Sequence, residues 1–245
     1  MLKKSKSIYF IKRLFTLVDE KNKLDIIKYN KNMQNILDIS LINYKFFSER
    51  YIIFEKNGIG KEYNNYNDTL VFEGEYLNKK RNGRGKEYNE DGILIYEGEY
   101  ISGKRNGKGK KYFYKNGKLI YEGEFLNGEK HGKGKEYTID NGSLKFEGEF
   151  INGLRNGKGK EFDIYDGSLL FEGKYLNGKR NGRGQEIHDN GKILFEGEYL
   201  NGKRNGKGKE YYDNGKIKFE GEYLNGERIG KGKEFYDNGN ILFEG

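Results

Sequence analysis

Cationic side chains recur at a fixed place along most of this chain, and their spacing suggests a binding surface. Each follows an Asn-Gly-type turn signal, and a second Lys or Arg comes three residues later. Acidic residues such as Asp213 mark the opposite turn of the same unit. The pattern predicts one basic edge, which would attract anionic lipid headgroups or an acidic protein, or would simply be a solvated edge that resists aggregation. The seven residues of this candidate anionic-ligand edge are Arg81, Arg105, Lys130, Arg155, Arg180, Arg204 and Arg228.

Other residue types capable of chemistry do not form catalytic patterns. The two histidines, His131 and His188, stand at variable positions, and no group of ligands with metal-site spacing accompanies them. Gly-x-Gly sequences recur, but no helix signal or P-loop Lys-Ser/Thr follows them. Carboxylate pairs such as Glu73 and Glu75 repeat as an exposed column, whereas a catalytic pair needs one desolvated member. We therefore expect no enzyme activity, no cofactor and no metal site.

These residues are positioned by an internal repeat. An aromatic-Glu-Gly sequence returns every 24 or 25 residues. A degenerate copy begins earlier, at Phe47. A period of this size predicts a repeat array in which each unit contacts only its neighbours. The copies begin at Phe72, Tyr96, Tyr121, Phe146, Phe171, Phe195, Phe219 and Phe243.

Each repeat is predicted to form a β-hairpin. Residues 217–224 alternate between apolar or glycine positions on one face and charged positions on the other. Asn225-Gly226 and Gly230 mark a reversal, residues 231–236 form a second short strand, and residues 237–239 turn the chain again. The mid-strand glycine, Gly221 in this copy, would let neighbouring rings lie over the backbone and let the sheet bend.

The predicted fold is therefore an all-β repeat array: an elongated, curved antiparallel meander of β-hairpins with a short N-terminal α-helical segment. Residues 1–46 form that segment, which we expect to cap the first edge of the sheet. Residues 47–245 form the array, with one degenerate copy, seven full copies and the start of another. Because the sequence stops three residues into a further repeat, we expect an open C-terminal edge that favours self-association, or a longer array from which this chain is a piece.

Composition limits the classes of partner. The net charge is +8, of which +6 lies in residues 1–46, so the array is nearly neutral and we expect no nucleic-acid binding. The absence of cysteine excludes disulfides and fits a reducing compartment. No apolar stretch is long enough to span a bilayer, and Lys12 and Arg13 interrupt the only signal-peptide-like start.

Residues 121–134, Tyr-Glu-Gly-Glu-Phe-Leu-Asn-Gly-Glu-Lys-His-Gly-Lys-Gly, resemble the MORN repeat, and about 200 residues share this pattern. The Asp-Asn-Gly-Lys turn is similar to variant MORN repeats. The resemblance implies a curved hairpin array that serves as a scaffold or binds proteins, with membrane or anionic-lipid association in some members. Departures from the pattern are Lys79 for the turn glycine, Lys174 for the second Glu, Ile187 for an aromatic and Ile229 for the turn Asn.

The first 46 residues allow several functions. Residues 14–24 and 27–31 resemble an F-box, a family that recruits a ubiquitin-ligase adaptor, although its usual leading proline is absent. A plain helical cap and a basic targeting segment are the alternatives. For the whole chain we expect a non-enzymatic scaffold for a protein partner, with anionic-phospholipid binding and an F-box-like substrate adaptor as further possibilities. The expected location is the cytoplasm, with peripheral attachment to a membrane as the alternative.

Overall fold

The computed structural model describes residues 50–55 and 58–245. The helical segment, cap and F-box-like sequence predicted for residues 1–46 lie outside the described residues. Seventeen strands account for most of the rest. The strands are β1 (Arg50–Phe54), β2 (Ile59–Asn64), β3 (Leu70–Leu77), β4 (Lys80–Tyr88), β5 (Leu94–Ile101), β6 (Lys104–Tyr112), β7 (Leu119–Leu126), β8 (Glu129–Tyr137), β9 (Leu144–Ile151), β10 (Leu154–Phe162), β11 (Leu169–Leu176), β12 (Lys179–Ile187), β13 (Ile193–Leu200), β14 (Lys203–Tyr211), β15 (Ile217–Leu224), β16 (Glu227–Phe235) and β17 (Ile241–Glu244).

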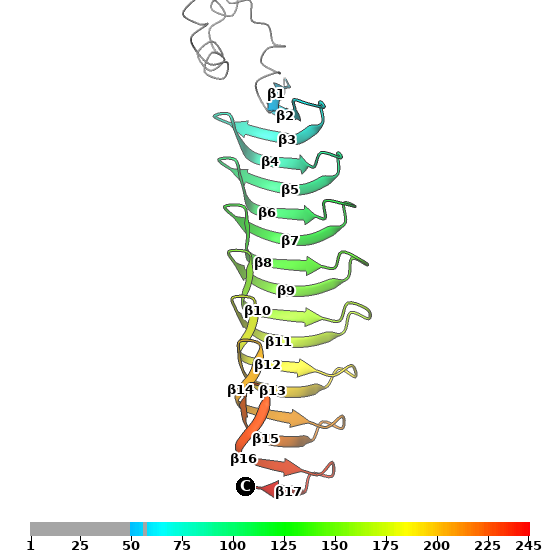
Figure 1. Ribbon diagram of the computed structural model, residues 1–245, viewed down its shortest axis with the longest axis vertical. Coiled ribbons are helices and arrows are strands. Elements are labelled where there is room, and N and C mark those ends of the chain that lie inside the picture. The colour runs from blue at the N-terminus through cyan, green and yellow to red at the C-terminus, as the bar shows by residue number, and fades with distance from the viewer. Residues whose placement is uncertain (1–49, 56–57) are drawn as a thin grey trace, which may run out of the picture.

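Every strand pairs antiparallel with the next strand along the chain. The result is one open sheet in which the bowed strands follow one another along the long axis of the molecule (Figure 1). No helix occurs among the described residues. The predicted all-β meander of hairpins is therefore confirmed for this part of the chain.

Reversals within a hairpin are shorter than the sequence suggested. Asn225 and Gly226 have φ angles of 53° and 97°, as expected for a two-residue hairpin turn in which both residues are left-handed. The second strand then begins at Glu227, not at the predicted Lys231. Gly230, with φ of 60°, lies inside that strand at a register shift. Its positive φ therefore marks a β-bulge and not the end of a turn.

The core is a single zigzag of aromatic rings on one face of the sheet, which we call the ring face. Phe171 packs edge-to-face against Tyr175 of its own strand, with ring centroids 5.7 Å apart. It packs in the same way against Tyr199 of the next hairpin, at 5.2 Å. Edge-to-face pairs add about 0.5–1.5 kcal/mol to the burial of the rings. The buried rings are Phe72, Tyr96, Tyr100, Tyr121, Phe125, Phe146, Phe150, Phe171, Tyr175, Tyr199, Phe195, Phe219 and Tyr223.

Paired glycines make room for these rings. Gly148 and Gly159 face each other on β9 and β10, and a Cβ atom on Gly148 would lie 2.6 Å from the carbonyl oxygen of Lys158. A Cβ atom on Gly159 would lie 2.4 Å from Cζ of Phe146. Neither approach is possible for a real side chain. The expectation that mid-strand glycines let rings lie over the backbone is thus confirmed.

Candidate functional site

The seven predicted edge cations lie in strands and not in the turns where the sequence placed them. Arg81 is the second residue of β4, and Arg180 is the second residue of β12. Because the hairpin turn takes only two residues, each of these side chains falls on the ring face. Their side chains are only 16% to 33% exposed. The predicted location at the turns is therefore wrong.

Each of these cations covers an aromatic ring of its own hairpin. The guanidinium carbon of Arg155 lies 4.1 Å from the ring centroid of Phe146, and that of Arg204 lies 4.1 Å from Phe195. Cation–π contacts of this kind contribute about 0.5–1 kcal/mol, and more when desolvated. The cations thus form the outer layer over the aromatic zigzag.

The same cations join successive hairpins by ion pairs. Arg155 contacts Glu136 of the preceding hairpin at 2.8 Å and Glu161 of its own hairpin at 3.1 Å. Arg81 does the same with Glu62 at 2.9 Å and Glu87 at 2.7 Å. We call this alternation of carboxylate and cation along the ring face the ring-face ladder. The anions of the ladder are Glu62, Glu87, Glu136, Glu161, Glu186, Glu210 and Glu234.

Electrostatics within the ladder favour the ionised forms. Burial by itself would raise the pKa of Glu136, but Lys130 and Arg155 outweigh it and hold that pKa below its ordinary value. Burial likewise opposes ionisation of Glu62, and Arg81, with hydrogen bonds from Arg50 and Tyr76, lowers its pKa overall. Most charges on the predicted basic edge are therefore compensated within the sheet. Anion binding by the seven cations as a group stays a prediction.

The opposite face of the sheet is hollowed into a groove. Its longer part has a volume of about 1640 Å³ and runs from Ile59 on β2 to Arg183 on β12. A second part of about 830 Å³ begins at Glu172 and continues to Lys231 on β16. The two parts share Glu172 and Arg183, so they meet at β11 and β12. The groove therefore follows the long axis of the array.

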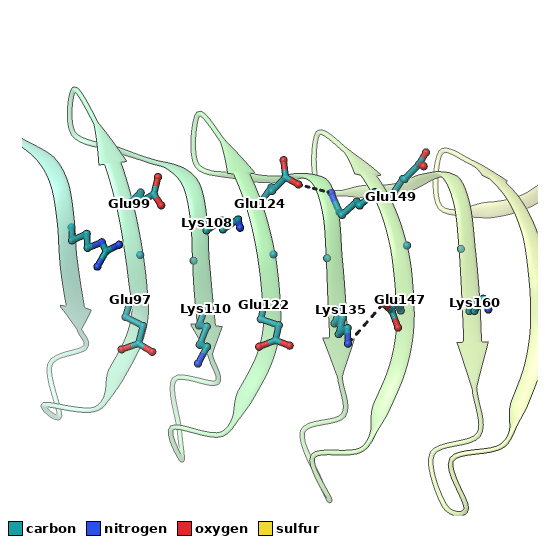
Figure 2. A pocket seen from close by; sticks show the side chains of 18 of the residues that line it. Glu97, Glu99, Lys108, Lys110, Glu122, Glu124, Lys135, Glu147, Glu149 and Lys160 are labelled. Atoms are coloured by element: carbon teal, nitrogen blue, oxygen red, sulfur yellow. Dashed lines mark hydrogen bonds and ion pairs between the residues drawn. The ribbon is translucent and has the colours of Figure 1, made fainter.

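Charges in the groove alternate from strand to strand (Figure 2). Lys135 on β8 lies 3.8 Å from Glu147 on β9, and Lys160 on β10 lies 3.3 Å from Glu172 on β11. These exposed pairs contribute a few tenths of a kcal/mol each and help to fix the register. Columns of opposite charge on neighbouring strands therefore run along the groove face.

In most full hairpins, a second carboxylate turns toward the bulge instead of toward a cation. Glu124 accepts a hydrogen bond from the main-chain N–H of Lys133 at 3.3 Å, and Glu149 accepts one from Lys158 at 3.3 Å. Since these carboxylates serve the backbone, the basic side chains beside them have no ion-pair partner among the described residues. The column of exposed, unpaired cations lining the groove is Arg84, Lys108, Lys133, Lys158, Arg183, Lys207 and Lys231.

An exposed aliphatic column continues the groove face toward the hairpin turns. Leu126, for example, follows Glu122 and Glu124 on alternate positions of β7 and is 42% exposed. The same position is apolar in every full hairpin. We call this set the aliphatic column; its members are Leu77, Ile101, Leu126, Ile151, Leu176, Leu200 and Leu224. Sequence analysis did not single it out, although the column is visible once the repeats are aligned on their Glu-Gly-Glu positions.

The remaining departures and histidines have local roles. Lys79 takes the left-handed turn position with φ of 61°. Lys174 faces the groove, where it replaces the carboxylate that faces the bulge in other hairpins. Its Cδ atom lies 3.5 Å from the place that a Cβ atom on Gly182 would occupy. Nε2 of His188 lies 3.8 Å from Asp213, whereas Nδ1 of His131 is buried without a partner among the described residues. No three acidic or histidine side chains come together as a metal site within residues 50–55 and 58–245.

Comparison with known families agrees with this geometry. The MORN repeat matches residues 72–93, 96–118, 121–143, 146–163, 171–193, 195–217 and 219–241, which together exceed half of the chain. The chain belongs to the MORN-repeat family. The MORN repeat variant also matches, at residues 110–127. All these matches lie within the hairpin array, and they do not support the F-box-like interpretation of the first 46 residues.

Comparisons with curated proteins and with solved structures are less informative. A search of curated proteins found no match. A crystal structure of TarM is 12% identical over 65% of this chain and 25% of TarM, with a TM-score of 0.24. A mutant of S. aureus TarM in complex with fondaparinux, alpha-GlcNAc-glycerol and UDP is 14% identical over 81% of this chain and 27% of that one, with a TM-score of 0.17. This chain thus spans about a quarter of each structure.

In the part of the chain that the structure describes, no helix is long and apolar enough to cross a bilayer.

Proposed function

We propose that this MORN array is a non-enzymatic scaffold that binds an extended segment of a protein partner along the groove. The observation that carries the proposal is the aliphatic column, which leaves seven large apolar side chains between 42% and 59% exposed on the groove face. Exposed apolar side chains that gather on one face of a protein and are bordered by charges often mark an interaction site. The cytoplasm remains the expected compartment.

The groove chemistry indicates how such a partner would be held. Backbone groups in the middle of the sheet are already paired between strands, so the partner must be recognised by side chains. Apolar residues of the partner would cover the aliphatic column, and charged residues would pair with the alternating Glu and Lys of the groove. Apolar burial supplies most of the free energy of such an interface, while the charges set orientation.

A variant with three charges in the aliphatic column tests the scaffold proposal. Leu126→Asp, Ile151→Asp and Leu176→Asp together should abolish co-purification of specific partners, quantified by mass spectrometry. The matched control places Asp at three exposed apolar residues outside the groove, Tyr114, Ile139 and Tyr165. Partners retained by the control and lost by the groove variant support the proposal. Equal recovery with both variants contradicts it.

Peripheral association with an anionic membrane is a second candidate, and one observation favours it. The basic column of the groove forms no ion pair among the described residues, unlike the cations of the ring-face ladder. Each such cation near an anionic surface contributes about 1 kcal/mol, screened by salt. Reversal of Lys108, Lys133 and Lys158 to Glu should then abolish sedimentation with phosphatidylserine vesicles at low salt.

The cations of the ring-face ladder provide the comparison for that experiment. If the ring face binds lipid, reversal of Arg105, Arg155 and Arg204 to Glu should reduce sedimentation with the vesicles more than the groove variant does. Circular dichroism must show that the array is still folded. Absence of binding by the unmodified chain to phosphatidylserine vesicles at low salt would refute membrane association by either face.

A further inference from the structure

The ring-face ladder follows one rule in most of the array: each cation bridges the carboxylate of its own hairpin and that of the preceding hairpin. Arg204 contacts Glu186 and, at 3.3 Å, Glu210. Arg228 contacts Glu210 at 2.5 Å and Glu234 at 2.6 Å. Since every carboxylate between two cations is shared, positive and negative charges alternate from hairpin to hairpin.

Lys111 breaks this rule. It stands opposite Tyr96 and Tyr121, in the register position that Glu87 and Glu136 hold in the neighbouring hairpins. Three cations therefore follow one another on the ring face: Arg105, Lys111 and Lys130.

Both neighbours of Lys111 have lost one of their two partners. Arg105 contacts Glu87 through Nε and Nη2, whereas the Nη1 atom that reaches the second carboxylate in Arg155 or Arg204 has no such acceptor among the described residues. Lys130 contacts Glu136 at 2.5 Å and forms no second ion pair within the part of the chain that the structure describes. Arg105 and Lys130 are thus the ladder cations on either side of a position where the ladder has a third cation in place of a carboxylate.

Compensation for Lys111 from within the sheet is weak. Burial lowers the pKa of Lys111, Arg105 and Lys130 lower it further, and Glu129 opposes them without reversing the effect. At three other ladder positions a tyrosine hydroxyl also binds the carboxylate, as Tyr199 binds Glu186 at 2.9 Å. The corresponding residue here is Phe125, whose ring packs against Tyr96. The cluster therefore has unused capacity for one negative charge.

We propose that Arg105, Lys111 and Lys130 form an anion-binding site that takes the carboxylate of an acidic side chain on a protein partner. The inference rests on the proposed scaffold function, and it extends that function to the ring face. One carboxylate would neutralise Lys111 between Arg105 and Lys130, with charge-assisted hydrogen bonds to the three cations.

An acidic protein side chain fits this site better than a membrane does. A membrane surface is attracted by many uncompensated cations spread over one face. On the ring face, Arg81, Arg155 and Arg180 each bridge two carboxylates, so the excess of positive charge is confined to one point. A single carboxylate carried by a protein matches that local excess.

The site can be tested on the full chain by NMR titration with the acidic peptide Gly-Ser-Glu-Glu-Ser-Gly and with its Gln-Gln counterpart. We expect shifts at Arg105, Lys111 and Lys130 with the acidic peptide only. Lys111→Glu, which extends the ladder rule, should weaken binding about tenfold, as expected for loss of a charge-assisted contact. Lys174→Glu makes the same charge change in the groove and should leave the affinity unchanged.

Other outcomes overturn the proposal. Equal weakening by Lys111→Glu and Lys174→Glu would show an effect of net charge alone. Binding of inorganic phosphate but not of the acidic peptide would make this a small-anion site, and Lys111-dependent binding to phosphatidylserine vesicles would make it a lipid site. Loss of partners from the aliphatic-column variant leaves peptide binding at Lys111 unaffected, so failure of the scaffold proposal and failure of this one can be told apart.

Discussion

Both faces of this sheet carry charges of both signs, but they use them differently. On the ring face, cations such as Arg155 are half-buried, lie over aromatic rings and join two carboxylates. On the groove face, cations such as Lys158 are exposed and have no ion pair among the described residues. The difference shows that one face holds successive hairpins together, while the other leaves side chains available for a partner.

Removal of a buried aromatic ring from the ring face should cause the largest loss of stability. Phe171 is fully buried between Tyr175 and Tyr199, so Phe171→Ala should lower the free energy of unfolding by about 3–5 kcal/mol. Leu176→Ala, on the exposed aliphatic column of the same strand, should change it by less than about 0.5 kcal/mol. Urea unfolding followed by circular dichroism measures both values. Similar losses in the two variants would remove the distinction between the faces.

Acid should weaken the ring face selectively. The folded-state pKa values of Glu62, Glu136 and Glu210 lie below the ordinary value, because nearby cations outweigh burial. Their contribution is therefore complete above the unfolded pKa of about 4.3 and is lost as the pH falls through the folded values. Urea midpoints should fall steeply below about pH 4.5. A midpoint that stays constant down to pH 3 would contradict the role assigned to the ladder.

One ladder cation can be compared with a neighbouring cation on the same strand. Arg180 covers Phe171 and bridges Glu161 and Glu186, so Arg180→Ala should cost about 1–2 kcal/mol. Lys179 is the adjacent exposed residue, and Lys179→Ala should lower the free energy of unfolding by less than about 0.5 kcal/mol. Thermal unfolding of the two variants gives the comparison, and equal costs would argue against a structural ladder.

The smallest expected effect is a gain in stability. Lys111→Glu replaces an uncompensated, half-buried cation by a carboxylate between Arg105 and Lys130, so it should raise the free energy of unfolding by about 1 kcal/mol. Lys174→Glu, in the exposed groove, should add only a few tenths of a kcal/mol. Urea unfolding at neutral pH distinguishes them. A loss of stability in Lys111→Glu would mean that the break in the ladder is not electrostatic.

The fold was largely predictable because period, alternation and turn residues agree within each repeat. The place of the cations was not, because Gly83 and Gly230 resemble turn residues in the sequence but lie at bulges within strands. Once the strand is known to start directly after the two-residue turn, the alternation of side chains puts Arg81 and Glu87 on the same face.

Lys111 was in principle visible before the structure. Aligning the repeats shows Lys where six other copies have Glu, from Glu87 to Glu234. The surroundings of Lys111 could not be predicted from the sequence, since only the structure shows that it lies between two cations on the aromatic layer. The groove also required the structure, because its shape depends on the bend of the strands (Figure 1).

Pairing between consecutive strands also has a consequence for how the chain folds. Each strand makes its extensive contacts with the strands immediately before and after it, so contacting residues are close in sequence and loop-closure entropy is small. Folding can then nucleate at any well-matched pair of hairpins and spread in both directions. Growth should slow at the junction around Lys111, where neighbouring hairpins share fewer ion pairs, so the array is expected to fold and unfold as two blocks that meet there.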